Sequence, residues 1–300
     1  MTKNTSHKSG GYGARPVSVD IARGRSMSEA ASPNGDGVVK TTGLPLTNQV
    51  VADRLSLAHW PRSHQIFVCS LAGGTGRTTV AGLMATVLAE LPYAHIWHPV
   101  GLVDAAPRTL CHTRRRWDVI EPPGPTTTLT SDQACTRSGA WALTGLPSST
   151  ERLDFSVLVV DAPAGLPSDL PGVQEDPQAS VVLVTRPDRV SLADAADALV
   201  AMNDRSQITR GRVAVAINCG TGRGDRGSRA AATALGIRCA SIHSLPWHST
   251  LGPERVLPSG RALDIALRRR VNRLCLSIWS QTQTSTRPTA LSSLHPLEHA

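Results

Sequence analysis

The chain has 300 residues, enough for one large α/β domain with extensions, and a net charge of +8. Its six cysteines are scattered without a Cys-x-x-Cys pair, so neither a disulfide framework nor a zinc ribbon is indicated. There is no run of about 18 apolar residues, and no apolar stretch follows the basic N-terminal segment, so we expect a cytoplasmic protein.

Two terminal segments differ in composition from the centre of the chain. Residues 1–48 are rich in Gly, Ser, Thr, Asn and basic residues without apolar periodicity, so they cannot bury enough surface to offset the entropy lost on ordering. We predict a flexible basic arm at 1–48, a flexible tail of similar composition at 282–300, and one domain at 49–281.

Short apolar runs alternate with helical patterns through this domain. Several runs are apolar at consecutive positions, as in a parallel sheet with both faces covered by helices. The alternation predicts right-handed βαβ units and a doubly wound, mostly parallel α/β sheet, which binds ligands at the carboxyl ends of its strands. The segment 107–150 fits poorly, and we interpret it as an irregular insertion with one helix. The predicted strands are 65–70, 100–103, 155–160, 180–184, 212–218 and 238–243, and the predicted helices are 78–91, which carries one apolar stripe, 190–203 and 226–235.

The stretch "FVCSLAGGTGRTTVAG" at 67–82 has the outline of a phosphate-binding loop. Its glycines follow the first strand and precede a helix, so backbone N–H groups converge and the helix dipole adds positive potential. A nucleotide-binding P-loop places a lysine before its Ser/Thr, whereas this chain has Arg77, a bulkier planar cation. Thr78 is placed to give its hydroxyl to a magnesium ion. We therefore predict a phosphate site that lacks the usual lysine.

Asp161 is the second candidate, because it follows the apolar strand in "VLVVDAPAG" (157–165). A carboxylate at this strand tip, beside the loop, can hold a magnesium-bound water. A lone aspartate after a strand more often caps a turn or helix, but at this distance after a phosphate-binding loop it fits the Walker B acid. We expect Mg²⁺ on Thr78 and Asp161.

Five motifs, in this order, resemble the ParA/MinD family of deviant Walker ATPases. The likeness spans about residues 64–280 and implies the P-loop NTPase fold of that family. The motifs are the loop Ala72–Thr79, "GLVDAAP" (101–107) for the second strand and switch I, "VVDAPAGLPSD" (159–169) for switch II, "VAVAINCG" (213–220) for the strand that ends in the adenine-reading asparagine, and "SLPWHS" (244–249) for the segment that lines the base.

The resemblance implies a set of ligands for ATP and Mg²⁺. Asn218 corresponds to the residue that reads adenine, and Pro246 belongs to the segment that lines the base. The implied nucleotide-binding residues are Gly73, Gly74, Thr75, Gly76, Arg77, Thr78, Thr79, Asn218 and Pro246.

Three departures from the family pattern fall on groups used for hydrolysis. Ala72 stands where the family has its signature lysine, which reaches the nucleotide across a sandwich dimer, and Arg77 stands where it has the loop lysine. Ala106 replaces the aspartate that orients the attacking water, while Asp104 is kept. Because such cations contribute several powers of ten to the rate, we expect slow hydrolysis at most, with Asp104 and Arg77 as the catalytic residues.

The segment 259–279 reads as a basic amphipathic helix. It is interpreted either as a peripheral membrane contact, as in the MinD-like branch, or as the last helix of the fold with a solvated basic face, which we favour. Between residues 204 and 273 the chain has 13 arginines against four acidic residues, an excess that suits nonspecific contact with DNA phosphates.

The sequence thus predicts an ATP-binding ParA/MinD-like switch that partitions or positions DNA, the septum, or secretion or envelope machinery. The resemblance implies a nucleotide-dependent homodimer, association with the nucleoid or the membrane, and a protein partner that the sequence does not name. The alternative is a catalytically inactive pseudo-ATPase that serves as an interaction scaffold.

Overall fold

The computed structural model describes most of the predicted domain, and all described residues belong to one compact unit, Pro45–Ala300. The predicted arm up to residue 47, the tail from 286 onward and nearly all of the predicted 226–235 helix lie outside the described residues. Described are residues 48–61, 63–91, 99–105, 116–120, 134–148, 152, 154–170, 173, 176, 178–204, 210–219, 235, 238–246, 248–252, 255–259 and 262–285.

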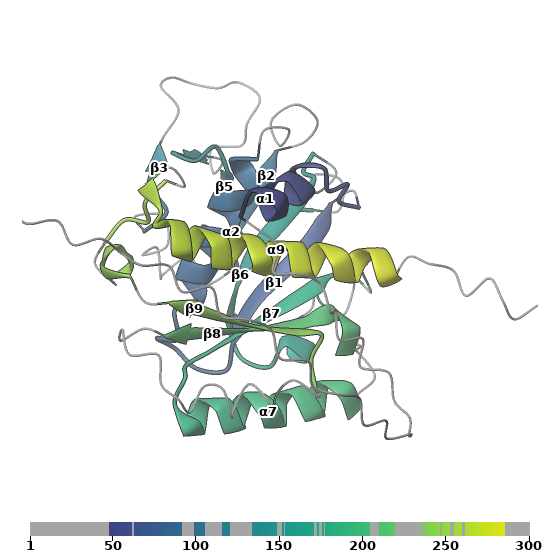
Figure 1. Ribbon diagram of the computed structural model, residues 1–300. Helices are drawn as coiled ribbons and strands as arrows, with labels where there is room; N and C mark the ends of the chain where they lie inside the picture. The colour runs from purple at the N-terminus through teal and green to yellow at the C-terminus, as the bar shows by residue number, and fades with distance from the viewer. Residues whose placement is uncertain are drawn as a thin grey trace, which may run out of the picture. The chain divides into compact units, whose positions relative to one another are not determined.

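A nine-stranded sheet forms the centre of this unit, in the order β3-β4-β5-β2-β6-β1-β7-β8-β9 (Figure 1). Neighbours from β5 to β9 in that order pair in parallel, and β4 and β3 add antiparallel pairs at one edge. The predicted doubly wound, mostly parallel sheet is therefore confirmed. The strands are β1 (His64–Ser70), β2 (Val100–Asp104), β3 (Val119–Ile120), β4 (Ala134–Thr136), β5 (Trp141–Thr144), β6 (Val157–Ala164), β7 (Ser180–Thr185), β8 (Val213–Cys219) and β9 (Ser241–Pro246).

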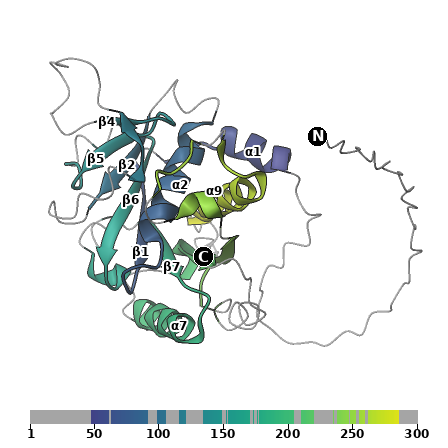
Figure 2. The ribbon, with the colours of Figure 1, turned by 90° about the vertical axis from the view of Figure 1, so that its left-hand side faces the viewer.

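Helices cover both faces of the sheet, as Figure 2 shows. The helices with described bounds are α1 (Asn48–Ser56), α2 (Arg77–Ala89), α7 (Arg189–Asp204) and α9 (Ile265–Ser285), together with the short 3-10 helices η2 (Pro167–Asp169), η3 (Arg210–Arg212) and η4 (Ser249–Leu251). Strand β1 lies between helices on both faces of the sheet, because all its side chains are buried. Ile66 and Val68 pack into the core that includes α2 and α9, while Phe67 and Cys69 pack into the core that includes α7.

Helix α2 is more deeply buried than its sequence pattern suggested. Every residue from Thr79 to Ala89 is buried, so the prediction of a single apolar stripe is wrong for this helix. Trp117 and Leu257 explain part of this burial, because a Cβ added at Gly82 would meet both side chains within 3 Å. The bounds predicted for this helix and for α7 agree with the structure to within two residues.

The segment 107–150 differs from the irregular insertion with one helix that the sequence predicted. Its described part contributes the strands β3, β4 and β5, and β5 extends the parallel sheet by pairing with β2. Its short strands escaped sequence analysis because pairing with β2, and not an apolar run of their own, stabilises them. Strand β9 also begins three residues later than expected, at Ser241.

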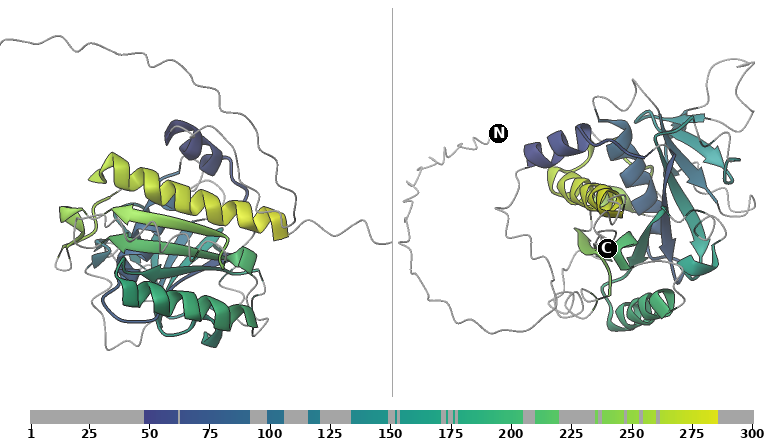
Figure 3. Two further views of the ribbon diagram at one scale, coloured as in Figure 1. Left: turned by 60° about the horizontal axis from the view of Figure 1, so that its bottom comes forward. Right: turned by 90° about the vertical axis from the view of Figure 1, so that its right-hand side faces the viewer.

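Helix α9 crosses the sheet beside β9 and contacts α1, α2 and β9 (Figures 1 and 3). Its apolar stripe, extended at the N-terminal end by Leu263, is fully buried, as the interpretation of this segment as a helix packed into the fold predicted. The buried residues of the stripe are Leu263, Leu267, Val271, Leu274 and Ile278. No helix among the described residues is long and apolar enough to cross a membrane.

Candidate functional site

The glycine loop lies between the central strand β1 and the helix α2, at the carboxyl edge of the sheet. Gly74 has φ +72° and Gly76 has φ +88°, the left-handed region that side chains other than glycine rarely adopt. Gly76 caps α2, and its carbonyl accepts the N–H of Val80 at 2.9 Å, but it has no side chain of its own to cap the helix. The first N–H groups of a helix have no carbonyl partner within it, so this end of α2 suits an anion.

Space lies open over this loop. A Cβ added at Gly73 or Gly74 would meet no atom within 4 Å. Thr75, by contrast, is buried, and its hydroxyl has no hydrogen-bond partner within the described part of the chain. The loop thus combines a left-handed backbone with free volume on one side, as a phosphate-binding loop requires.

Arg77 and Asp161 form an ion pair at the centre of the site. The Arg77 Nε donates to Asp161 Oδ1 at 2.6 Å, although the two residues are 84 positions apart. The Asp161 side chain is 0% exposed and that of Arg77 is 17% exposed. The other carboxylate oxygen, Oδ2, is buried and accepts no hydrogen bond from any described residue. The loop cation and the candidate metal acid are therefore bound to each other.

Asp104 is next to Asp161 across the sheet, because β2 and β6 pair in parallel with these two residues in register. Burial raises the pKa of Asp161, while Arg77 and a hydrogen bond from Thr78 act in the opposite direction and Asp104 adds to the rise. The two carboxyl groups and one guanidinium thus form a compact charged cluster. The predicted catalytic pair, Asp104 and Arg77, belongs to it, together with the predicted metal ligands.

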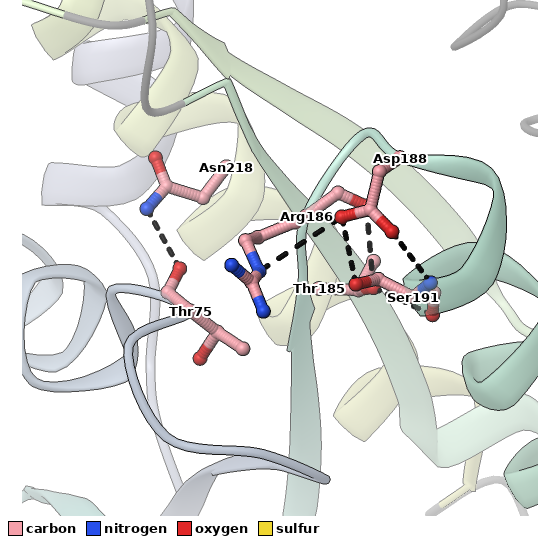
Figure 4. A network of polar contacts seen from close by, with 6 residues as sticks. All are labelled: Thr75, Thr185, Arg186, Asp188, Ser191 and Asn218. Atoms are coloured by element: carbon pink, nitrogen blue, oxygen red, sulfur yellow. Dashed lines mark hydrogen bonds and ion pairs between the residues drawn. The ribbon is translucent and has the colours of Figure 1, made fainter.

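Asn218, at the carboxyl end of β8, is bound to the loop in this structure (Figure 4). Its Nδ2 donates to the Thr75 carbonyl at 2.8 Å. A Cβ at Gly76 would lie 2.0 Å from the same Nδ2, so a side chain there would displace Asn218 from the loop and would also be strained at this φ. Pro246 ends the neighbouring strand β9, in register with Cys219. The adenine-reading role of Asn218 and the contact of Pro246 with the base stay predictions.

Arg116 was missed by sequence analysis. Its guanidinium donates to Thr79 Oγ1 at 3.0 Å from Nε, and to the carbonyls of Leu251 and Gly252 at 2.9 Å each. Thr79, predicted to bind nucleotide, gives its hydroxyl to this contact. Trp117 adds a hydrogen bond from Nε1 to the Thr78 carbonyl at 3.2 Å. Together they anchor the first turn of α2 to the insertion and to η4. A clue was the basic run that ends at Arg116, in a segment otherwise interpreted as irregular.

A second cation that sequence analysis missed is Arg186, directly after β7. It lies 3.8 Å from Asp188 and is 53% exposed (Figure 4). Asp188 accepts hydrogen bonds from the Ser191 N–H at 2.9 Å and hydroxyl at 2.8 Å, and these bonds lower its pKa. Asp188 thus stabilises the start of α7, and Arg186 is an accessible cation at the edge of the sheet that carries the loop.

The sequence suggested that α9 has a solvated basic face, but its arginines are not all exposed. Arg268 contacts Glu90 at 3.3 Å, Arg269 is half-buried, and Arg270 is exposed. His243 of β9 is partly buried near this basic cluster, and desolvation, together with Arg270 and Arg273, lowers its pKa to about 4. The apolar stripe of α9 is part of the core and is not available to a membrane in this fold.

Comparison with known proteins found similarity in structure and none in sequence: no family model and no curated protein matches the chain. A nucleotide-binding protein from Archaeoglobus fulgidus, in complex with ADP, is 17% identical over 85% of this chain and 100% of its own, with a TM-score of 0.40. The cell division ATPase MinD from Pyrococcus furiosus is 17% identical over 74% of this chain and 99% of its own, with a TM-score of 0.49.

A putative plasmid partition protein from Borrelia burgdorferi B31, bound to AMPPNP, is 11% identical over 75% of this chain and 100% of its own, with a TM-score of 0.46. The chain is thus similar to MinD and to plasmid partition proteins.

Proposed function

We propose that this chain binds ATP as a ParA/MinD-like switch, with weak hydrolysis, and partitions or positions DNA, the septum, or secretion or envelope machinery. One observation carries the proposal: the glycine loop that opens α2 has two left-handed glycines, no side chain at the N-cap Gly76, and open space above Gly73 and Gly74. The motif order of the family supports the choice of adenine nucleotide over other phosphate ligands.

The proposed roles divide between binding and chemistry. The backbone of Gly73–Gly76 and the first turn of α2 bind the phosphates, and Asn218 and Pro246 contact the base. Asp104 and Arg77 take part in slow hydrolysis. Magnesium on Thr78 and Asp161 stays a prediction, and the Arg77–Asp161 ion pair bears directly on it.

A pseudo-ATPase scaffold is the second candidate, and this ion pair favours it. Arg77 donates to Asp161, so the cation expected to stabilise the transferred phosphoryl group is engaged with a carboxylate. Ala72 stands in place of the signature lysine, and the chain has no lysine after Lys40. Nucleotide binding without turnover would then serve assembly.

The proposed partners follow from charge and family resemblance. We propose a nucleotide-dependent homodimer in the cytoplasm that contacts DNA nonspecifically through exposed arginines such as Arg270, and an unidentified protein partner. Membrane contact through the 259–279 helix is the weaker proposal, because a vesicle would have to bind the helix through its basic side alone.

Calorimetry with ATP and the full chain tests the proposed function. Gly74→Val is expected to abolish the binding heat, because it forces a β-branched residue to φ +72° and fills the open space above the loop. The strain is about 1–3 kcal/mol, less than a typical domain stability of about 5–15 kcal/mol, so the variant should stay folded by circular dichroism.

Gly211→Val is the matched control, since a Cβ at Gly211 also meets no atom within 4 Å and its φ is not positive. This variant should bind ATP like the wild type. Wild-type protein that releases no heat with ATP at concentrations of about 1 mM, near the upper end of ordinary affinities for enzyme substrates, would refute the proposed function.

A further inference from the structure

Arg77 binds Asp161, the carboxylate that was expected to hold a metal. A divalent ion in such a site bridges the acid at the strand tip and the nucleotide phosphates. Here the acid, Asp161, already receives a charged hydrogen bond from Arg77 at 2.6 Å. A guanidinium is protonated at any physiological pH, so this is a permanent cation.

The arrangement does not fit Mg²⁺. Magnesium requires oxygen ligands and keeps several of its waters. Asp161 Oδ1 is bonded to Arg77, Oδ2 is buried, and the side chain is 0% exposed, so no hydrated ion can reach it without the ion pair first opening. A divalent ion beside Thr78 and Asp161 would also lie close to the positive charge of Arg77 and be repelled by it.

The same geometry fits phosphate oxygens. Only Nε of Arg77 makes a hydrogen bond within the described part of the chain, which leaves the two terminal nitrogens for a ligand. The side chain is 17% exposed, and Arg77 is the first residue of α2, directly after the glycine loop. A planar fork that binds a carboxylate through Nε can bind a phosphate through its terminal nitrogens at the same time, which a lysine ammonium does with less geometric control.

We propose that Arg77 is a built-in cation that takes the place of Mg²⁺ as the bridge between Asp161 and the nucleotide phosphates, so that the loop binds ATP and ADP without a metal. The proposal rests on the proposed nucleotide binding and adds its metal independence. It accounts for Asp161 being retained although its carboxylate is engaged by an arginine: the acid orients the guanidinium.

Titration calorimetry of the full chain with ATP and ADP, in excess EDTA and in excess MgCl₂, tests the proposal. For each nucleotide, the dissociation constants of the wild type in EDTA and in MgCl₂ are expected to agree within about threefold. In Arg77→Lys the compact ammonium leaves Asp161 without a bridging fork, so ATP affinity should fall by about tenfold or more when MgCl₂ is replaced by EDTA. MgCl₂ alone should release no binding heat with the wild type.

Arg137→Lys is the matched control. Arg137 makes the same contact, from Nε to Asp118 at 2.7 Å, but its side chain is 65% exposed. This variant should bind ATP like the wild type in both buffers. The proposal is overturned if wild-type affinity falls about tenfold in EDTA, or if Arg77→Lys is as metal-independent as the wild type. Absence of binding in both buffers would instead refute nucleotide binding itself, and the metal proposal with it.

Discussion

Replacement of Arg77 by methionine should expose the cost of the buried Asp161 carboxylate. Methionine preserves most of the side-chain length and removes the charge, so Asp161, which is 0% exposed, is left without its cation. Loss of one partner of a buried pair costs about 3–5 kcal/mol. A Coulomb estimate agrees: two charges about 4 Å apart at an effective dielectric constant of about 20 attract by about 4 kcal/mol.

Protonation of Asp161 limits this loss. Neutralising an ordinary aspartate at about pH 7 costs about 4 kcal/mol, from about 1.4 kcal/mol for each unit above its unfolded pKa. Burial already raises the pKa of Asp161, and removal of Arg77 raises it further. A carboxyl with a raised folded-state pKa stabilises the protein at low pH and loses that contribution as pH rises. The loss in Arg77→Met should therefore shrink by up to about 1.4 kcal/mol per unit as pH falls from about 7 toward 5.

Urea unfolding of the wild type and of Arg77→Met across this pH range measures the difference between their free energies of unfolding. Buried neutral histidines destabilise both proteins in acid, and they cancel in the difference. Adding Asp161→Asn to Arg77→Met should restore most of the stability. Arg137→Met, at an exposed ion pair, should lose no more than about 1 kcal/mol. A loss below about 1 kcal/mol for Arg77→Met, or a loss that does not change with pH, would show that Arg77 does not stabilise an ionised Asp161.

Three further predictions concern turnover, DNA and acid stability. Steady-state ATP hydrolysis should lie far below about 1 s⁻¹, and Ala72→Lys, Arg77→Lys and Ala106→Asp together should raise it; brisk wild-type hydrolysis would contradict this. DNA affinity should fall steeply with salt, by about 0.9 log units per phosphate contacted per log unit of salt. Arg270→Glu should reduce this salt dependence without affecting ATP binding. A DNA affinity that does not change with salt would exclude contact between the arginines and DNA phosphates. Burial lowers the pKa of His64 to about 4, so the stability that neutral His64 contributes is present above pH 6.5 and lost as pH falls toward 4. The free energy of unfolding of His64→Gln should therefore depend less on pH in acid than that of the wild type. An unchanged pH dependence would contradict the burial of neutral His64.

Short-range patterns in the sequence were enough to predict several parts of this protein. Consecutive apolar residues indicated the central strands, and the glycines at 73–76 indicated the loop and the start of α2, because left-handed backbone and strand burial depend on neighbouring residues. The apolar stripe of α9 was likewise visible as a period of three and four residues, and the structure buries it in the core.

Contacts between side chains that are far apart in the sequence could not be predicted and follow from the folded chain. Arg77 and Asp161 are 84 residues apart and are brought together because β1 pairs in parallel with β6. Arg116 reaches Thr79 from the insertion, and β5 becomes a strand by pairing with β2. Such contacts depend on strand register and on packing across the sheet, to which distant segments contribute equally. For this reason the residue types at the loop indicated a phosphate site, whereas the ion pair at its centre became visible only in the folded chain.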